Sequence, residues 1–90
     1  WETELFTIYF SIKNQPAGWY DVNITCSGNH VSGSPLQIHK SQYETAYDFC
    51  DVPDPGTYHV TIKMKNGGII YNNDVTIYWP NGPPSEEVRV

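Results

Sequence analysis

The sequence predicts an all-β protein, an antiparallel β-sandwich of about seven short strands with one disulfide. Apolar and polar side chains alternate with period two along most of the chain, as half-buried strands require. Clusters rich in Gly, Pro and Asn interrupt this alternation at intervals typical of sandwiches. No segment of useful length shows the 3.6-residue period or the capping pattern of a helix. With 90 residues, the chain is long enough for one domain with a modest core.

The first predicted strand covers residues 5–12 (Leu5 to Ile12). One face carries Phe6, Ile8, Phe10 and Ile12, and the other carries Leu5, Thr7, Tyr9 and Ser11. A second strand, 19–26, follows a break at 14–18 and places Tyr20, Val22 and Ile24 on one face. Further strands are expected at 36–39, 43–52, 57–65, 69–71 and 75–78.

The segment 57–65 alternates most clearly, with Tyr58, Val60 and Ile62 on the face expected to enter the core. Asn66-Gly67 follows it and predicts a hairpin, because a type I′ turn needs positive φ at both central residues. From Pro80 onward the composition becomes polar and rich in proline. We therefore expect residues 1–79 to form the sandwich domain and residues 80–90 to be a flexible tail or linker.

The two cysteines, Cys26 and Cys50, allow one intramolecular pairing. A disulfide that closes a loop of about 25 residues removes roughly 3 to 4 kcal/mol of unfolded-state entropy. The alternative is two free thiols that pack as small apolar groups. Alternation cannot place both Phe49 and Cys50 in the core, and we expect Phe49 to be buried. Cys50 then points outward, and its bond to Cys26 joins strand ends.

Asn23-Ile24-Thr25 is an N-glycosylation sequon, and the strand alternation places Asn23 on the outward face. Together with the predicted disulfide, it favours a secreted, extracellular glycoprotein. An ordinary strand asparagine is the alternative interpretation.

Ten acidic and five basic residues give a net charge of −5, with no basic cluster beyond Lys63 and Lys65. Binding to nucleic acid is therefore not expected, because neutralisation of phosphate dominates such affinity. No apolar run approaches the 18 residues of a membrane span, so none is expected.

The corner Asp54-Pro55-Gly56-Thr57-Tyr58 resembles the Asp-x-Gly-x-Tyr corner of immunoglobulin-like sandwiches and is similar to prealbumin-like modules. In the immunoglobulin family the tyrosine hydroxyl returns to nearby backbone. The second cysteine of that family would fall at Val60, whereas Cys50 precedes the corner here. The segments Val52 to Tyr58 and Gly67 to Ile77 also resemble MD-2-related lipid-recognition domains. These resemblances imply an architecture and do not by themselves imply a function.

Asp48, Asp51 and Asp54 supply oxygen ligands at a regular spacing and form a candidate Ca²⁺ site. Their spacing matches no standard calcium loop, and a solvated acidic corner is the favoured interpretation. We expect no metal and no cofactor. The serines lack a nucleophile elbow, and so small a sandwich has little room for a catalytic cleft. We therefore do not expect an enzyme.

Aromatic residues make up 14% of the chain, more than a small core can hide. Exposed Trp and Tyr side chains are suited to protein interfaces and to stacking on sugars. Aromatic rings that cap the ends of the sandwich are the alternative. The candidate binding residues are Trp1, Tyr9, Trp19, Tyr71, Tyr78 and Trp79.

The leading functional hypothesis is a secreted, non-catalytic recognition module that binds a protein partner, as effector, receptor or adhesion modules do. A carbohydrate-binding module that uses exposed Trp and Tyr is the first alternative. A small lipid-binding sandwich is the second. A homodimer formed through the apolar strand Leu5 to Ile12 is also expected, because an uncovered edge strand pairs with other chains.

Overall fold

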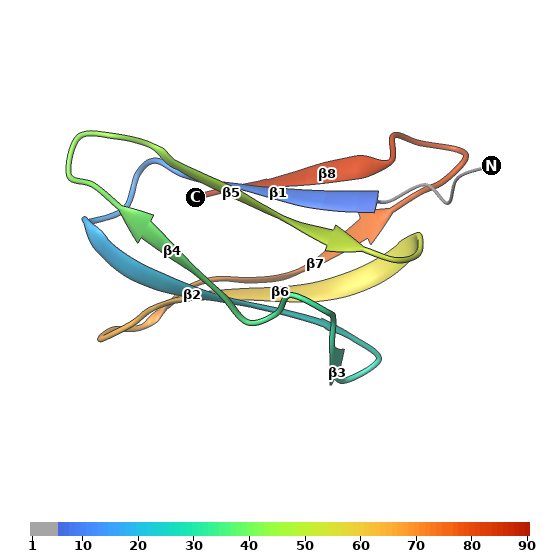
Figure 1. Cartoon of the computed structure of the whole chain (residues 1–90), viewed down its shortest axis with the longest axis horizontal. Coiled ribbons are helices and arrows are strands. Elements are labelled where there is room, and N and C mark those ends of the chain that lie inside the picture. Colours follow the sequence, from blue (N-terminus) through green and yellow to red (C-terminus); the bar gives the residue numbers. More distant parts are fainter. Residues whose placement is uncertain (1–5) are drawn as a thin grey trace.

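The structure is a computed structural model that describes residues 6–90 of the chain. These residues form eight strands and no helix (Figure 1). The strands are β1 (Phe6–Ile12), β2 (Gly18–Cys26), β3 (Asn29–His30), β4 (Leu36–Lys40), β5 (Ala46–Val52), β6 (Gly56–Met64), β7 (Ile69–Ile77) and β8 (Ser85–Arg89). The prediction of an all-β fold is confirmed, and none of residues 6–90 lies in a helix that is long and apolar enough to cross a membrane.

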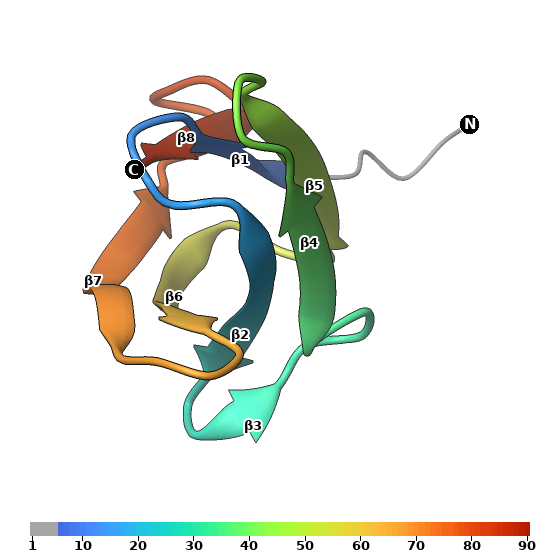
Figure 2. The same ribbon diagram turned by 90° about the vertical axis from the view of Figure 1, so that its left-hand side faces the viewer.

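The strands form two sheets that face each other across the core. Sheet A has the order β5-β1-β8, and sheet B has the order β3-β2-β6-β7, with β4 also paired to β2. Viewed along the long axis, the sheets curl toward each other, so that β4 lies beside β5 and β7 beside β8 (Figure 2). The result is a β-sandwich-like molecule with a strongly curved outline.

The core contains the side chains that period-two alternation assigns to it. Phe6, Ile8, Phe10 and Ile12 of β1 are buried against Tyr20, Val22 and Ile24 of β2 and Tyr58, Val60 and Ile62 of β6. Each of these strands carries three or more apolar residues of one parity. Burying that set fixes the register, because a slip of one residue would expose all of them.

Strand β1 lies in the middle of sheet A. Its residues pair antiparallel with β5 from Phe6↔Val52 to Ile12↔Ala46, and parallel with β8 from Thr7↔Ser85 to Ser11↔Arg89. Two expectations are therefore wrong: the sheet is not purely antiparallel, and the strand is not an open edge. The homodimer expected through Leu5 to Ile12 has lost its basis, because both edges of residues 6–12 are already paired. Leu5 itself lies outside the described residues.

Residues 85–89 of the expected tail form β8 instead. Val88 is buried in the core, and Val90 continues the pairing through hydrogen bonds with Ser11, Lys13 and Asn14. The sandwich domain thus extends beyond residue 79. The composition of residues 80–90 did not predict this strand, because only one side chain of β8, Val88, is buried and polar residues flank it.

The β6–β7 hairpin confirms the predicted pairing but not the predicted turn. Neither Asn66 nor Gly67 has a positive φ, so the turn is not of type I′. The backbone closes instead over five residues, with Gly67 N–H donating to Met64 C=O and Met64 N–H donating to Gly68 C=O. The expected strands 69–71 and 75–78 are one strand, β7, because Asn72, Asn73 and Asp74 stay in the ladder with β6.

Strand β5 has the phase opposite to the one expected. Cys50 is 5% exposed and faces the core, whereas Phe49 is 55% exposed and faces solvent. Ala46 and Val52 share the parity of Cys50 and are also buried. Burying Phe49 would turn Ala46, Cys50 and Val52 outward. These three smaller apolar residues together therefore determine the register of β5.

Two tyrosines tie strand starts to the backbone that precedes them. The Tyr58 hydroxyl donates to the Asp54 carbonyl at 2.5 Å, which is the return to backbone that the resemblance implied. The Tyr20 hydroxyl donates in the same way to the Pro16 carbonyl. In both cases a glycine with positive φ, Gly56 or Gly18, lies two residues before the tyrosine. Burial raises the pKa of both tyrosines.

Candidate functional site

The outer surface of sheet A carries three aromatic side chains, Tyr9, Tyr47 and Phe49, which we call the aromatic face. Tyr9 lies opposite Phe49 in the β1–β5 ladder, and Tyr47 lies two pairs further along, opposite Ser11. The three side chains share one face because successive outward residues of a strand are two apart. Tyr9 is 46% exposed and Tyr47 is 74% exposed, so these rings present apolar area to solvent.

The rings of Tyr9 and Phe49 contact each other at an angle. Their centroids are 6.1 Å apart, and their planes are inclined by 49°. Tyr9 and Tyr47 also line a shallow depression of about 450 Å³ together with Glu87. The aromatic face is therefore uneven and does not present one flat platform.

Charged and polar groups border the aromatic face on both sides. On β8, Arg89 Nε donates to Glu87 Oε1 at 2.6 Å, and Glu87 lies opposite Tyr9 in the parallel ladder. On β5, Asp51 accepts a hydrogen bond of 2.9 Å from the Thr7 hydroxyl. Protein interfaces have this arrangement, with large apolar rings at the centre and a polar rim around them.

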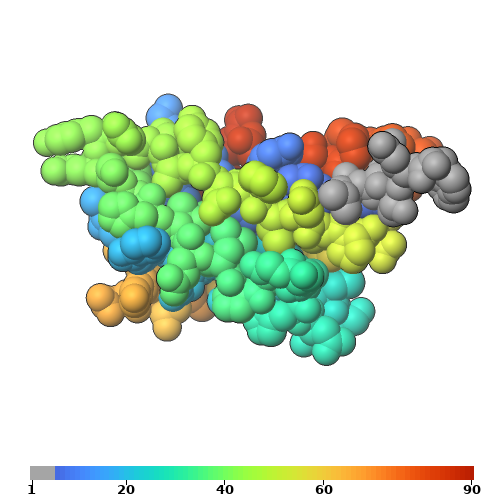
Figure 3. Space-filling view, in the orientation of Figure 1, coloured from blue at the N-terminus to red at the C-terminus, as the bar shows by residue number. Residues whose placement is uncertain are grey.

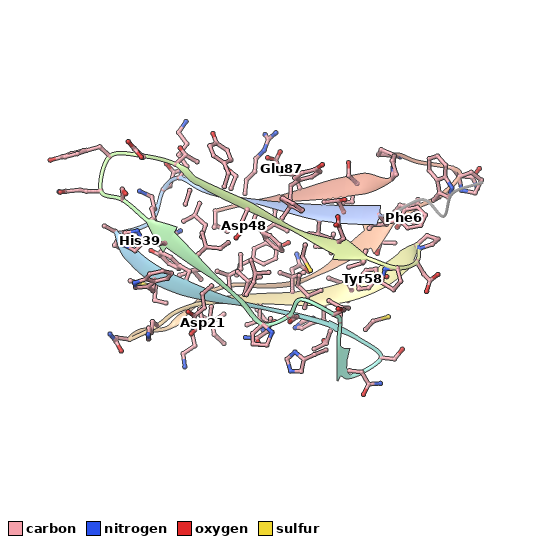
Figure 4. The ribbon with its side chains drawn as sticks, in the orientation of Figure 1. Phe6, Asp21, His39, Asp48, Tyr58 and Glu87 are labelled. Carbon is pink, nitrogen blue, oxygen red and sulfur yellow. The ribbon has the colours of Figure 1, made fainter. Side chains whose placement is uncertain are left out.

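The predicted binding residues do not form one surface. Tyr9 lies on the outer side of sheet A, whereas Trp19 lies on the outer side of sheet B, 48% exposed, with its ring 4.9 Å from that of His39. Figure 4 makes the separation visible: Glu87, the ladder neighbour of Tyr9, and Asp21, which shares the parity of Trp19, project from opposite sides of the molecule.

The remaining predicted aromatic residues lie near the ends and edges of the strands. Trp79 packs edge-on against Phe6, with ring centroids 6.1 Å apart, and caps one end of the core. Tyr71 is partly buried against the core, and Tyr78 is exposed just after β7. Trp1 lies outside the described residues. For Trp79 and Tyr71, capping and packing account for the side chain.

Sequence reasoning missed Tyr47 and Phe49 as binding residues. The signal that could have revealed them is the parity of their neighbours, because Ala46, Cys50 and Val52 are the apolar residues that a buried face of β5 would use. Aromatic residues at the other parity must then face outward. The position of Tyr9 beside them depends on the β1–β5 ladder, which joins residues about forty positions apart.

The three aspartates expected to be candidate calcium ligands do not converge. Asp51 accepts from Thr7 on the outer side of sheet A, and Asp48 accepts from the Phe49 N–H at 2.8 Å. Asp54 belongs to the turn before β6 and offers its carbonyl to Tyr58. Within residues 6–90, no three His, Cys, Asp or Glu side chains are grouped closely enough to hold a metal ion.

The predicted disulfide is absent from the structure, in which Cys26 and Cys50 are both free thiols. The Cys50 sulfur packs against the β3–β4 segment, 3.8 Å from the Ser32 carbonyl oxygen and beside Gly33. Burial, followed by the charges of Asp51 and Asp48, raises the pKa of the Cys50 thiol. The prediction of a staple between strand ends is therefore wrong here, since Cys50 faces inward.

The glycosylation sequon lies on the outer side of sheet B. Asn23 is partly exposed in β2 and pairs with Thr61 of β6, as its outward parity predicted. Across the same sheet, His59 Nδ1 lies 2.9 Å from Asp74 Oδ1, and hydrogen bonding to that carboxylate raises the pKa of His59. This polar surface is opposite the aromatic face.

Comparisons with known proteins identify no relative: no protein-family model, no curated protein and no solved structure matches the chain. The resemblance to immunoglobulin-like and prealbumin-like modules therefore stays a prediction. Function has to be argued from the surfaces described above.

Proposed function

We propose that the protein is a secreted, non-catalytic recognition module that binds an extracellular protein through the aromatic face. The observation that carries this proposal is the grouping of Tyr9, Tyr47 and Phe49 on the solvent side of sheet A. Aromatic side chains provide large, rigid contact area at low entropic cost, and they are enriched among the residues that dominate interface energies.

A protein partner suits this face better than a glycan does. Sugar rings stack on flat aromatic surfaces, whereas the Tyr9 and Phe49 rings are inclined by 49°. The Glu87–Arg89 ion pair and the Thr7–Asp51 hydrogen bond supply a rim with both donors and acceptors. Such a rim complements the mixed polar surface that surrounds a typical protein interface.

The sequon supports secretion, and its position is compatible with binding. Because both cysteines are free, the disulfide no longer contributes to the argument for an oxidising compartment. A glycan on Asn23 would project from sheet B, on the side away from Tyr9. It would leave the aromatic face open to a partner.

The experiment is a screen of the purified protein against a panel of extracellular proteins, followed by surface plasmon resonance on each hit. We expect saturable binding that falls at least tenfold in a Tyr9→Ser/Phe49→Ser variant, because removing central aromatic contacts commonly costs about 2 kcal/mol or more. Trp19→Ser, on the opposite face, is the matched control and should bind as the wild type does. A hit that survives the double substitution and is lost in Trp19→Ser would contradict the proposal.

Carbohydrate binding is the second candidate, and the Trp19–His39 pair is the observation that favours it. The indole is half exposed, and the outer side of sheet B around it is polar. A single exposed indole beside hydrogen-bonding groups can stack on a sugar ring. Saturable binding on a glycan array that Trp19→Ala abolishes would place this function ahead of protein recognition.

A further inference from the structure

A groove of about 1040 Å³ opens between the two sheets, along the free edge of β5 and away from Trp19. One wall is formed by residues 48–55, which comprise β5 and the turn after it, and the other is the β3–β4 segment. Figure 3 shows the two segments, residues around 30–36 and around 48–55, side by side on the surface facing the viewer. Its volume is at the upper end of the range of small-molecule sites, roughly 300–1,000 Å³.

The wall formed by the β3–β4 segment is held in place by β2. The Ile24 N–H donates to the Ser34 hydroxyl oxygen at 2.8 Å, and the Val31 N–H donates to the Ile24 carbonyl at 3.1 Å. These bonds occupy the gap on β2 between its pairing with β3 and its pairing with β4. The groove is therefore part of the folded framework, as small-molecule sites usually are.

Apolar side chains form most of the lining. Val31, Leu36 and Pro53 offer accessible apolar surface to the groove. Val52, Tyr58 and Cys50 lie beneath them and are almost completely buried. The raised pKa of Cys50 keeps this thiol neutral at pH 7, so that it acts as a small apolar surface. Such a lining favours the hydrocarbon part of a ligand.

The charge of the groove has one sign. Asp48 has the inward parity of β5 and is partly buried between the sheets, where Figure 4 places it. One of its carboxylate oxygens accepts from the Phe49 N–H, which leaves the other oxygen available. The described residues that line the groove include Asp54 and His30 but no Lys or Arg. Asp51 also borders the groove, but its carboxylate accepts from Thr7 on the outer side of sheet A. The buried Lys40 lies elsewhere on β4 and donates to the Ser41 carbonyl.

We propose that this groove binds a small amphipathic amine, with its hydrocarbon chain against Leu36, Val31 and Pro53 and its ammonium group at Asp48. An ammonium group matches both the inward carboxylate and the surrounding negative charge. A fatty acid or another anionic lipid would bring a second negative charge beside Asp48 with no cation to offset it. The site goes beyond the proposed protein recognition, because neither Tyr9 nor Tyr47 lines the groove. The two surfaces meet at β5, where Phe49 belongs to both and Asp48 also lines the depression beside Tyr9.

The test uses three probes with one chain length: octylammonium, octanol and octanoate. Each is titrated into ¹⁵N-labelled protein at pH 7, where an alkylamine is protonated as a lysine side chain is. We expect saturable shifts of the amide signals of Leu36, Cys50 and Val52. Octylammonium should bind about five- to tenfold more tightly than octanol, as one partly buried charge-assisted contact predicts, and octanoate should bind most weakly.

Asp48→Asn tests the position of the ammonium group. This variant should bind octanol unchanged and lose the preference for octylammonium. Asp21→Asn is the matched control, since it removes one negative charge from the outer side of sheet B and should preserve the preference. A readout that needs no variant is the alkylation of the partly exposed Cys26 by N-ethylmaleimide, which saturating octylammonium should slow.

Three results would overturn the proposal. The first is the absence of saturable shifts for all three probes in the wild type. The second is octanoate binding as tightly as octylammonium. The third is a preference for octylammonium that persists in a folded Asp48→Asn variant. A Tyr9→Ser/Tyr47→Ser variant removes two rings of the aromatic face that do not line the groove, so binding of octylammonium to that variant tests the groove independently of the proposed function.

Discussion

At the level of single residues, two tyrosine hydroxyls fix the starts of β2 and β6. Tyr20 donates to Pro16, and Tyr58 donates to Asp54, so each bond spans four residues and closes the turn before its strand. Both rings are almost completely buried. A phenylalanine at either position keeps the buried ring but leaves the partly buried carbonyl of Pro16 or Asp54 without this donor.

Tyr58→Phe and Tyr20→Phe should each lower the free energy of unfolding by about 1 kcal/mol, the net value of one buried hydrogen bond. Urea denaturation followed by tryptophan fluorescence measures the change. Tyr43→Phe is the matched control, because Tyr43 is exposed in the β4–β5 loop and should leave the midpoint unaltered. Equal midpoints for Tyr58→Phe and Tyr43→Phe would show that the corner bond contributes nothing.

The same tyrosines predict how stability depends on alkaline pH. Burial raises the folded-state pKa of Tyr20 and Tyr58 above the unfolded value, so above that value the folded state holds more protons than the unfolded state. The contribution of these two tyrosines to the free energy of unfolding is then fully present below the ordinary tyrosine pKa of about 10. It is lost as the pH rises through their folded-state pKa values. The two phenylalanine variants should show a smaller loss between neutral and strongly alkaline pH.

The sequence could anticipate Tyr58 but not Tyr20. Asp54-Pro55-Gly56-Thr57-Tyr58 carries a known corner pattern, whereas Pro16-Ala17-Gly18-Trp19-Tyr20 shares with it only the glycine two residues before the tyrosine. The common physical requirement is a positive φ at that glycine, since Gly18 and Gly56 both adopt it. The conformation of the turn, which the sequence alone does not display, reveals that the two corners are equivalent.

At the level of elements, the success of sequence reasoning followed how unevenly the apolar residues divide between the two faces of a strand. β1, β2 and β6 have three or four each, and their buried faces were predicted correctly. β5 mixes Ala46, Cys50 and Val52 on one face with Tyr47 and Phe49 on the other. Both faces carry apolar area, so composition alone did not decide the phase. Pairing with the central strand β1 decides it.

Strand β8 gives the sharpest test at this level. Val88→Ala should destabilise the fold by about 2 kcal/mol, because Val88 is buried against the core and the cavity left behind adds to the lost transfer energy. Arg89→Ala, the neighbouring exposed position, should change stability by less than about 0.5 kcal/mol. Thermal unfolding followed by circular dichroism compares the two. If residues 85–89 were a tail, both variants would melt as the wild type does.

At the level of the whole molecule, the positions of the candidate binding surfaces follow from pairings between distant residues. The aromatic face joins Tyr9 to Phe49 across the β1–β5 ladder, and the groove brings residues of β5 beside the end of β2 and the β3–β4 segment. Alternation within a strand tells which side chains share a face. It does not tell which strands are neighbours, so the sequence could suggest exposed aromatic residues but not which of them meet.

The thiols provide a test of the whole molecule. With Cys26 and Cys50 free, the urea midpoint should be the same with and without a reductant such as tris(2-carboxyethyl)phosphine. The single variants should also differ: Cys50→Ala should cost about 1 kcal/mol because the side chain is buried, and Cys26→Ala should cost less because it is only partly buried.

A disulfide in solution would give the opposite pattern of stabilities. Reductant would then lower the free energy of unfolding by roughly 3 to 4 kcal/mol, the value for a loop of about 25 residues. Cys26→Ala and Cys50→Ala would show nearly the same loss, because each would break the same bond. Two results together would therefore show that the core between the two sheets, and not a disulfide, stabilises the fold. The first is a larger loss of stability in Cys50→Ala than in Cys26→Ala, and the second is a urea midpoint that is the same with and without reductant.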